Sequence, residues 1–459
     1  MSTVPDTERP VRSGRRMSDV EAVMWAVERD PTLASSFLNV TFLDRSPDLD
    51  RLRRRMDRAV RSARRMRQRV TPAPLLGVPG WEDDPAFDIT HHVRRLTLDA
   101  PGTDRQLLDL AAREYIAGFD LTRPLWQLVI VDGLEGDRAA LLAKMHHTIT
   151  DGVGGVRMSA MFLDLERDAP EPEHTAGEDE ADLDADVEGD GPALLEAIRR
   201  PFDLTRRAVA DAVESVTHPV ETAQSMLRQF LVTDRAHSPL WAGKRSTDRR
   251  FDVIGFPLDD AKRTAKTLGG TINDFYVTAV AGGAAAYHRA KGVDVTDLRV
   301  AMPVSTRTDR SAGGNAFAPT RVLVPAGIEH PAERFAAVHE QLSAVKGERA
   351  LGMADTFAGI VSNLPTPILL RLARAQVETV DFACSNVKGA PFELYVAGAK
   401  VLANHPMGPT GGTAFNATLL SYLGRLDIGV ASDTAAVDDP ELLRTSIDES
   451  LRELAAAGD

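Results

Sequence analysis

The chain has 459 residues, 43% of them apolar, and a formal net charge of −13. This length favours two domains or one large composite unit, and the composition is that of a globular protein. The single cysteine, Cys384, excludes a disulfide bond within the chain and fits a reducing compartment. No apolar run approaches the roughly 18 residues that cross a bilayer, and the N-terminal arginines precede no apolar signal segment. We therefore expect a cytoplasmic protein.

Five regions are expected along the chain, and a strongly acidic segment separates the two folded ones. Asp168 to Asp190 holds eleven acids and no Lys or Arg; without them the rest of the chain carries only −2. Such a segment cannot form a packed core and favours a flexible linker over an acidic interaction tail. The regions are a disordered N-terminus (1–16), a first domain with a histidine motif (17–165), the acidic linker (166–192), a helical connection (193–245) and a second domain (246–459).

An arginine-rich segment lies early in the first domain. Arg51 to Arg69 contains ten arginines and one acid, Asp57. Its apolar residues fall on one helical stripe: Leu52, Met56, Val60, Ala63 and Met66. One interpretation is a surface helix that packs this stripe on its own domain. The other is peripheral attachment to an anionic membrane or lipid-droplet surface. Nucleic acid is not expected as a partner, because the rest of the chain is mildly acidic.

In the second domain, apolar or β-branched runs bounded by turn residues alternate with helical patterns. The expected strands are 251–256, 298–303, 320–324, 380–384, 394–401 and 418–423. The expected helices are 259–268, 272–289, 331–345 and 439–454. Strands and helices alternate in both halves, which predicts an α+β fold with mixed sheets flanked by helices.

The most informative motif is His146-His147-Thr148-Ile149-Thr150-Asp151-Gly152, which follows a mostly apolar strand pattern at 140–145. Imidazole titrates near neutrality, so a held histidine can accept a proton from a hydroxyl group. Adjacent side chains of a strand point to opposite faces, so one histidine is expected to face a pocket and the other to pack. For the same reason the pair is poorly placed to chelate one metal ion, and no metal is expected.

A second pair, His91-His92, serves as an internal comparison. It has no acid and no glycine at the offsets of Asp151 and Gly152. We expect it to lie in a strand with partly exposed histidines.

Further short segments accompany the histidine motif in a fixed order. They are Pro124-Leu125-Trp126, Asn273-Asp274 and Asn386-Val387-Lys388-Gly389. Together with the histidine motif they resemble the bacterial wax ester synthase/diacylglycerol acyltransferase family, over residues 18 to 455 without the linker. The resemblance implies two chloramphenicol-acetyltransferase-like domains joined by a helical connection, with the active site in a tunnel between them. Lys388 stands where the family usually has proline.

The resemblance also implies roles for individual residues. His147 and Asp151 are the expected catalytic residues. His147 is expected to be the general base, and Asp151 to orient the loop. His146, Gly152 and Arg307 are expected to support the motif, with Arg307 as the partner of Asp151. Contacts with substrate or coenzyme A are expected from Pro124, Leu125, Trp126, Asn273, Asp274 and Asn386. Packing is the favoured role of Trp126, and helix capping remains an equal alternative for Asn273-Asp274.

The function implied is an O-acyltransferase that moves a long-chain acyl group from acyl-CoA to a fatty alcohol or a diacylglycerol. Acyl-CoA is a substrate, and no cofactor is expected. The chain has no G-x-S-x-G segment, which favours direct transfer without a covalent intermediate. Cys384 lies in an apolar strand pattern and is expected to be inert. Two alternatives remain: a condensation-type acyltransferase that takes its acyl group from a carrier protein, and a non-catalytic lipid-binding homologue.

Overall fold

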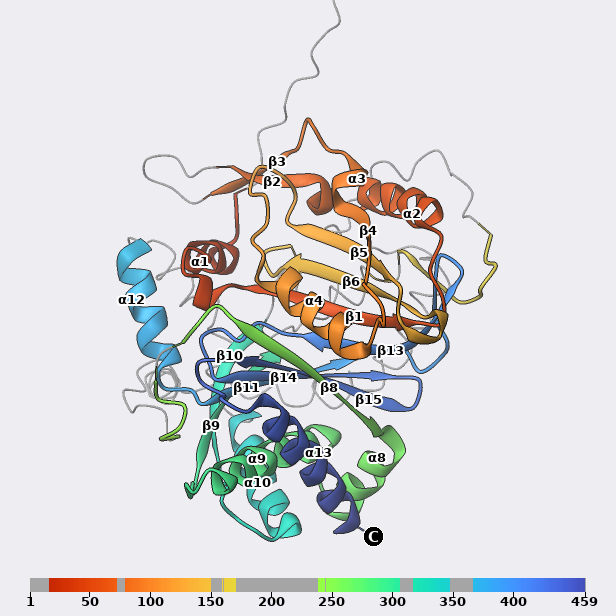
Figure 1. Ribbon diagram of the computed structural model, residues 1–459. Helices are drawn as coiled ribbons and strands as arrows, with labels where there is room; N and C mark the ends of the chain where they lie inside the picture. Colours follow the sequence, from red (N-terminus) through yellow and green to blue (C-terminus); the bar gives the residue numbers. More distant parts are fainter. Residues whose placement is uncertain are drawn as a thin grey trace, which may run out of the picture.

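The computed structural model describes residues 16–71, 79–149, 159, 161–170, 238–243, 245–305, 317–346 and 366–458. Within them the chain forms two large sheets with helices, one in each half (Figure 1). This is the α+β fold that the sequence predicts. The expected disordered N-terminus, most of the acidic linker and nearly all of the helical connection lie outside the described residues.

The first sheet has the strand order β4-β5-β6-β1-β13-β12-β7. The first half supplies β1 (Ser36–Leu43), β4 (Val93–Thr97), β5 (Trp126–Asp132), β6 (Ala139–His146) and β7 (Leu163–Asp164). The second half supplies β12 (Tyr395–Val396) and β13 (Ala399–Met407). β13 pairs antiparallel along β1, from Leu38 opposite Met407 to Leu43 opposite Val401. The second half thus completes the first sheet, which a division along the chain does not anticipate.

Alternating residues of the first sheet enter two separate cores, as a strand period of two requires. Leu128 and Ile130 of β5 join the core beneath α2, whereas Val129 and Val131 join the core that contains α4. The helices of this half are α1 (Asp19–Val27), α2 (Leu49–Ser62), α3 (Ile89–His92) and α4 (Asp104–Ile116). Three short 3-10 helices, η1 (Pro31–Leu33), η2 (Arg64–Arg67) and η3 (Glu135–Asp137), and the hairpin of β2 (Gln68–Thr71) and β3 (Gly80–Asp83) complete it.

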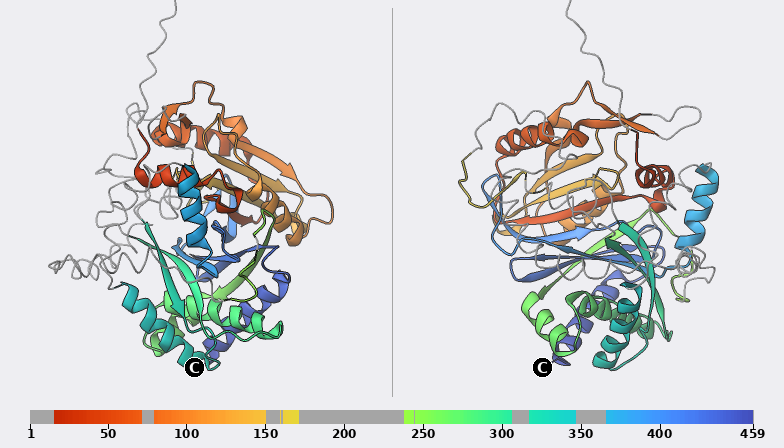
Figure 2. Two further views of the ribbon diagram at one scale, coloured as in Figure 1. Left: turned by 90° about the vertical axis from the view of Figure 1, so that its left-hand side faces the viewer. Right: turned by 180° about the vertical axis from the view of Figure 1, so that it is seen from behind.

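The second sheet has the order β10-β9-β11-β14-β15-β8. Its strands are β8 (Arg249–Pro257), β9 (Leu298–Ser305), β10 (Phe317–Val324), β11 (Phe382–Lys388), β14 (Phe415–Tyr422) and β15 (Arg425–Asp433). β14 runs parallel to β11 and antiparallel to β15, so the sheet is mixed as predicted. The helices are α8 (Leu258–Thr267), α9 (Ile272–Ala290), α10 (Pro331–Lys346), α12 (Thr366–Val377) and α13 (Pro440–Ala456). All but α12 cover the face turned away from the first half (Figure 2).

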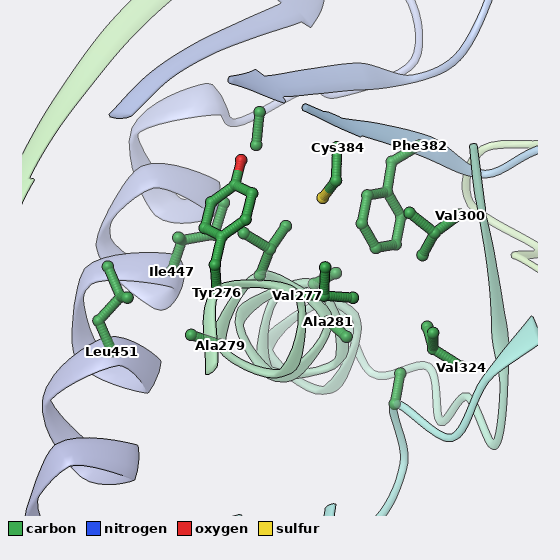
Figure 3. Packing of buried hydrophobic residues seen from close by; sticks show 14 of the residues in the cluster. Tyr276, Val277, Ala279, Ala281, Val300, Val324, Phe382, Cys384, Ile447 and Leu451 are labelled. Carbon is green, nitrogen blue, oxygen red and sulfur yellow. The ribbon is translucent and has the colours of Figure 1, made fainter. Parts of the chain in front are cut away.

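Helix α9 is the centre of the second core and is nearly enveloped by α13, α10 and the sheet. Its first turn is closed by a capping box, in which the Asp274 carboxylate accepts the Thr271 N–H at 2.7 Å. Gly283 allows α13 to approach closely, because a Cβ at this position would lie 2.5 Å from Cα of Ile447. Figure 3 shows Ile447 facing α9 from α13.

The arginine-rich segment packs its apolar stripe inward, as one of the two interpretations predicts. Leu52 and Met56 of α2 are fully buried in the first half. Several of the arginines form ion pairs: Arg51 and Arg55 with Asp164, Arg61 with Asp57, Arg64 with Asp83, Arg65 with Glu21 and Arg69 with Glu82. The arginine face is therefore largely engaged within the chain.

Candidate active site

The histidine motif begins at the end of β6, where the first sheet stops pairing. His146 is the last residue of that strand and is only 1% exposed. Its backbone N–H donates to the carbonyl of Leu125, and Ser36 of β1 lies opposite it in the sheet. The side chain therefore starts from a fixed backbone position.

Both ring nitrogens of His146 have hydrogen-bond partners. The Thr148 backbone N–H donates to Nδ1 at 3.1 Å, so Nδ1 acts as an acceptor. In a neutral imidazole the proton must then lie on Nε2, which donates to Oε2 of Glu28 at 3.0 Å. The Thr148 hydroxyl also lies 2.7 Å from Nδ1. These contacts fix the ring on both sides.

Glu28 follows α1 directly and connects the two histidines. Its Oε2 also accepts the backbone N–H of Ser35 at 2.8 Å, and the Ser35 carbonyl accepts the His147 N–H at 3.0 Å. Burial opposes ionisation of Glu28, but the hydrogen bonds and charges around it outweigh burial and lower the pKa of this carboxyl group. Sequence reasoning missed Glu28, which lies 118 positions before His146.

His147 has different surroundings from His146, as adjacent positions in an extended segment predict. Its side chain is half-buried, and its ring packs against Phe37 of β1 with the ring centroids 4.9 Å apart. The imidazole is partly accessible, and its backbone is held by the hydrogen bond to Ser35. Such a group can exchange a proton with a bound hydroxyl group.

A buried lysine lies two residues before His146 on the same strand. The Lys144 ammonium donates to the carbonyls of Glu114 and Ala117 at the end of α4 and lies over the ring of Phe119. Burial lowers the pKa of Lys144 to about 8, although Glu114 and Glu28 favour the charged form. This cation holds the C-terminal end of α4 against β6.

The Pro124-Leu125-Trp126 segment is brought next to the histidines by β-pairing. Trp126 lies opposite Met145 in the β5–β6 ladder, and Leu125 accepts the His146 N–H. All three side chains are buried, and the Trp126 indole donates to the Met66 carbonyl at 2.7 Å. The segment is thus part of the core that holds β6 in place.

The pair His91-His92 differs from what the sequence predicts. It ends the short helix α3, and the strand begins only at Val93. His91 is exposed, but His92 is 2% exposed and stacks between Phe87 and Trp126. The expectation of a strand with two partly exposed histidines was wrong, because Asp88 caps a helical turn and the aromatic neighbours enclose His92.

The second-half residues predicted to bind substrate lie around α9 and β11. Asn273 is half-buried in the first turn of α9, and Asn386 is exposed near the end of β11. Asp274 is fully buried and also contacts Nδ1 of His339 at 2.9 Å. The capping box shows that Asp274 shapes the start of this helix.

Cys384 lies in the second core, on β11 next to Tyr276 of α9 (Figure 3). Its side chain is fully buried, and burial raises the pKa of the thiol well above its usual range. A thiol in this environment is not available as a nucleophile at neutral pH.

Three predicted site residues, Asp151, Gly152 and Arg307, lie outside the described residues. Their roles stay predictions. In the described part of the chain, no three His, Cys, Asp or Glu side chains gather closely enough to hold a metal ion. Over the same residues, no helix is both long enough and apolar enough to cross a membrane.

The family comparisons cover nearly the whole chain. The wax ester synthase/diacylglycerol acyltransferase catalytic domain matches residues 17–276, and the C-terminal domain of the same family matches residues 313–455. A Mycobacterium tuberculosis protein named "Putative diacylglycerol O-acyltransferase" is 34% identical over 455 residues, which are 96% of this chain and 92% of that protein. A second one from the same organism, named "Probable diacylglycerol O-acyltransferase", is 28% identical over 428 residues, 90% and 89% of the two chains.

Solved structures share the fold. The wax ester synthase/diacylglycerol acyltransferase from Marinobacter aquaeolei VT8 matches 97% of this chain and all of its own, with a TM-score of 0.65 and 20% identity. The first condensation domain of the calcium-dependent antibiotic synthetase matches 98% of this chain and 97% of its own, with a TM-score of 0.64 and 16% identity. The expected two-domain α+β architecture is thereby confirmed.

This chain belongs to the wax ester synthase/diacylglycerol acyltransferase family. It is an O-acyltransferase of that family, and the histidine pair at the end of β6 belongs to the catalytic-domain match.

Proposed function

We propose that this protein transfers a long-chain acyl group from acyl-CoA to the hydroxyl of a fatty alcohol or a diacylglycerol, with His147 as general base. The observation that carries the proposal is the difference between the two neighbouring histidines. His146 is buried and bonded at both ring nitrogens, whereas the half-buried His147 rests on Phe37. Of the two rings, that of His147 is the more exposed, which supports its assignment as the base.

The proposed reaction needs one base that acts twice. A ring nitrogen of His147 accepts the proton of the alcohol as its oxygen attacks the thioester carbonyl, forming a C–O bond and a tetrahedral oxyanion. The oxyanion collapses, the C–S bond breaks, and the imidazolium returns the proton to the departing thiolate. The products are the ester and free coenzyme A, and the enzyme ends unchanged. No covalent enzyme intermediate is required.

A covalent route through Cys384 lacks support. The thiol is fully buried in the second core and its raised pKa disfavours the thiolate. Cys384→Ala should therefore retain the kcat of the unaltered protein. A burst of acyl-enzyme that disappears in this variant would contradict direct transfer.

The condensation-type alternative is the second candidate, because a condensation domain shares the fold of this chain. A donor competition assay separates the two functions. The acyl group is offered either on coenzyme A or on a carrier protein, with the same alcohol acceptor. Faster transfer from the carrier protein would favour the alternative, and ester formation from acyl-CoA alone supports the proposal.

Contact of the Arg51–Arg69 segment with an anionic membrane or lipid droplet stays a prediction. Ion pairs such as Arg55–Asp164, at 2.6 Å with both side chains buried, reduce the charge that this segment can offer to lipids. Flotation with anionic and neutral vesicles measures the contact. Equal binding to both kinds of vesicle, or binding to neither, would exclude electrostatic attachment to a lipid surface.

The function is tested with palmitoyl-CoA as donor and hexadecanol or dioleoylglycerol as acceptor, by following the ester and the released thiol. The expected result is ester formation with at least one acceptor, with one thiol released per ester. Thiol release without ester would indicate a hydrolase, and no turnover with either acceptor would support the non-catalytic alternative. The ratio of kcat/KM for the two acceptors identifies the preferred hydroxyl substrate.

A further inference from the structure

The second half of the chain contacts the segment between Glu28 and Ser35, the two residues that bond His146 and His147. Helix α12 lies beside α1 at the edge of the molecule (Figures 1 and 2). From α12, the Arg374 guanidinium donates from Nε to Oδ2 of Asp30 at 2.6 Å. Asp30 belongs to the first half and is only 5% exposed, whereas the Arg374 side chain is 62% exposed. The ion pair thus joins a buried carboxylate of one half to a surface cation of the other.

Asp30 shapes the turn that leads to the histidines. Its Oδ1 accepts the backbone N–H of Thr32 at 3.0 Å and the Thr32 hydroxyl at 2.8 Å, and so caps η1. The two oxygens of this carboxylate therefore have separate tasks: one closes the turn, and the other receives the guanidinium of α12.

The residues on either side of this turn contact the histidines. Glu28, before the turn, accepts from Nε2 of His146, and Ser35, after it, accepts the backbone N–H of His147. The Glu28 carboxylate bonded to the Ser35 N–H closes the segment into a loop. A displacement of Asp30 would therefore be passed to both histidines through groups no more than five residues away.

The same place is packed by apolar groups of both halves. Gly412 faces Val377 of α12 and Leu33 of η1: a Cβ at this glycine would lie 2.5 Å from the first side chain and 3.2 Å from the second. Beyond Val377 the chain enters β11, the strand that carries Asn386. The turn at Asp30 is thus packed near the end of α12, shortly before the chain enters a central strand of the second sheet.

From these contacts we propose that Arg374 is a positioning residue for the acyl transfer, through which the second half of the chain sets the geometry of His146 and His147. It does not touch the reacting atoms. It holds Asp30, Asp30 holds the turn, and the turn presents Glu28 and Ser35 to the two histidines. The kinetic part of this inference rests on the proposed function, since the reaction is the one assigned to His147.

Arg374→Ala is the principal variant, and Arg371→Ala, an exposed arginine on the same helix, is its matched control. Arg374→Lys keeps the charge. Asp30→Asn keeps a side-chain oxygen that can cap η1 but removes the negative charge, so it separates the ion pair from the turn. The double variant Asp30→Asn, Arg374→Ala completes a cycle that measures whether the two residues act through each other.

We expect Arg374→Ala to lower kcat by about 10- to 100-fold, the loss typical of a small misplacement of a catalytic group, with KM for palmitoyl-CoA within about 2-fold. Arg371→Ala should match the unaltered enzyme. Arg374→Lys should recover part of kcat, and the double variant should be no slower than the slower single variant. An unchanged kcat in Arg374→Ala, or equal losses in Arg374→Ala and Arg371→Ala, would overturn the inference.

A readout without turnover separates this inference from the proposed function. In protein labelled with 15N-histidine, the imidazole signals of His146 and His147 can be assigned by substituting each residue in turn. They should shift in Arg374→Ala but not in Arg371→Ala, while thermal unfolding reports whether the fold is kept. If the imidazole signals do not shift although Tm falls, the Arg374–Asp30 ion pair only stabilises the fold, and the positioning role is overturned. If the unaltered protein forms no ester but the imidazole signals shift in Arg374→Ala, the proposed function is refuted and the positioning role of Arg374 is kept.

Discussion

The chain contains two His-His dipeptides, which have different surroundings in the fold. In His91-His92, at the end of α3, the buried member donates through Nδ1 to the Trp126 carbonyl at 2.8 Å and stacks between aromatic rings. In His146-His147, at the end of β6, buried His146 donates to the Glu28 carboxylate. This carboxylate also accepts the N–H of Ser35, whose carbonyl accepts the backbone N–H of half-buried His147. The same dipeptide therefore has different surroundings in the two places, and in the second pair a carboxylate connects the two histidines.

Removing the more exposed imidazole of each pair should give the largest contrast. His147→Ala is expected to lower kcat/KM by roughly 10²- to 10⁴-fold, because a positioned general base contributes that much. His91→Ala removes an exposed imidazole and should leave kcat/KM unchanged. Initial rates of thiol release with palmitoyl-CoA and a saturating acceptor measure both. A fully active His147→Ala variant would exclude this residue as the base.

Removing the carboxylate should make the second pair resemble the first. Glu28→Ala leaves the Ser35 N–H and the Nε2–H of His146 without their acceptor, at a cost of up to about 1–3 kcal/mol for each group. We expect a kcat lower by about 10- to 100-fold through displaced histidines. Glu28→Gln keeps an acceptor oxygen and should lose less. If both the Ala and the Gln variants keep the kcat of the unaltered enzyme, the Glu28 carboxylate has no part in catalysis.

The buried member of the first pair should affect stability and not the reaction. His92→Ala opens a cavity between Phe87 and Trp126, and the free energy of unfolding should fall by about 2–4 kcal/mol, as for other large core side chains. His92→Phe fills the cavity and should cost less. Urea unfolding measures the loss, and kcat of the folded fraction should stay within about 2-fold of the unaltered enzyme. A large fall in kcat would instead connect His92 to the reaction.

The contributions of His92 and Glu28 to stability should also differ in their pH dependence. Burial lowers the pKa of His92 below its usual 6.5, so the unfolded chain binds a proton first and stability falls as the pH drops below about 6.5. The pKa of Glu28 is also lowered, so its contribution is complete above about 4.5 and is lost as the pH falls further.

His92→Phe should therefore flatten the loss that starts near pH 6.5, and Glu28→Gln the loss that starts near pH 4.5. The free energy of unfolding measured from pH 8 down to about pH 3 separates the two. If both variants have the pH profile of the unaltered protein, neither group is coupled to folding in this range.

Local signals in the sequence predict the elements well where caps and periodicity agree. Thr271 with Asp274 marks the start of α9, and Asp439 followed by Pro440 marks the start of α13. The alternation of a strand also predicts that His146 and His147 have different surroundings. Helix α3 is too short to show a helical period in the sequence. Asp88, two residues before Thr90, is nevertheless a capping signal that could have been noticed.

Contacts between distant parts of the chain could not be predicted in this way. No local pattern pairs Glu28 with His146, or Arg374 with Asp30, because a side-chain contact depends on the relative placement of whole elements. The arginine-rich segment illustrates the same limit. Its amphipathic stripe is visible in the sequence, but the acids that pair with it, such as Asp164 and Glu82, come from other elements.

The insertion of β13 into the first sheet has a consequence for how the chain is made. Asn39 of β1 and its neighbour Asn404 of β13 are 365 positions apart. At a synthesis rate of about 5–20 residues per second, β1 must wait roughly 20–70 s after its own emergence before its partner strand leaves the ribosome. Throughout that interval one edge of β1 is open, and an open strand edge pairs readily with other chains. The first half is thus most exposed to aggregation during translation, when a chaperone that covers this edge would have its greatest effect.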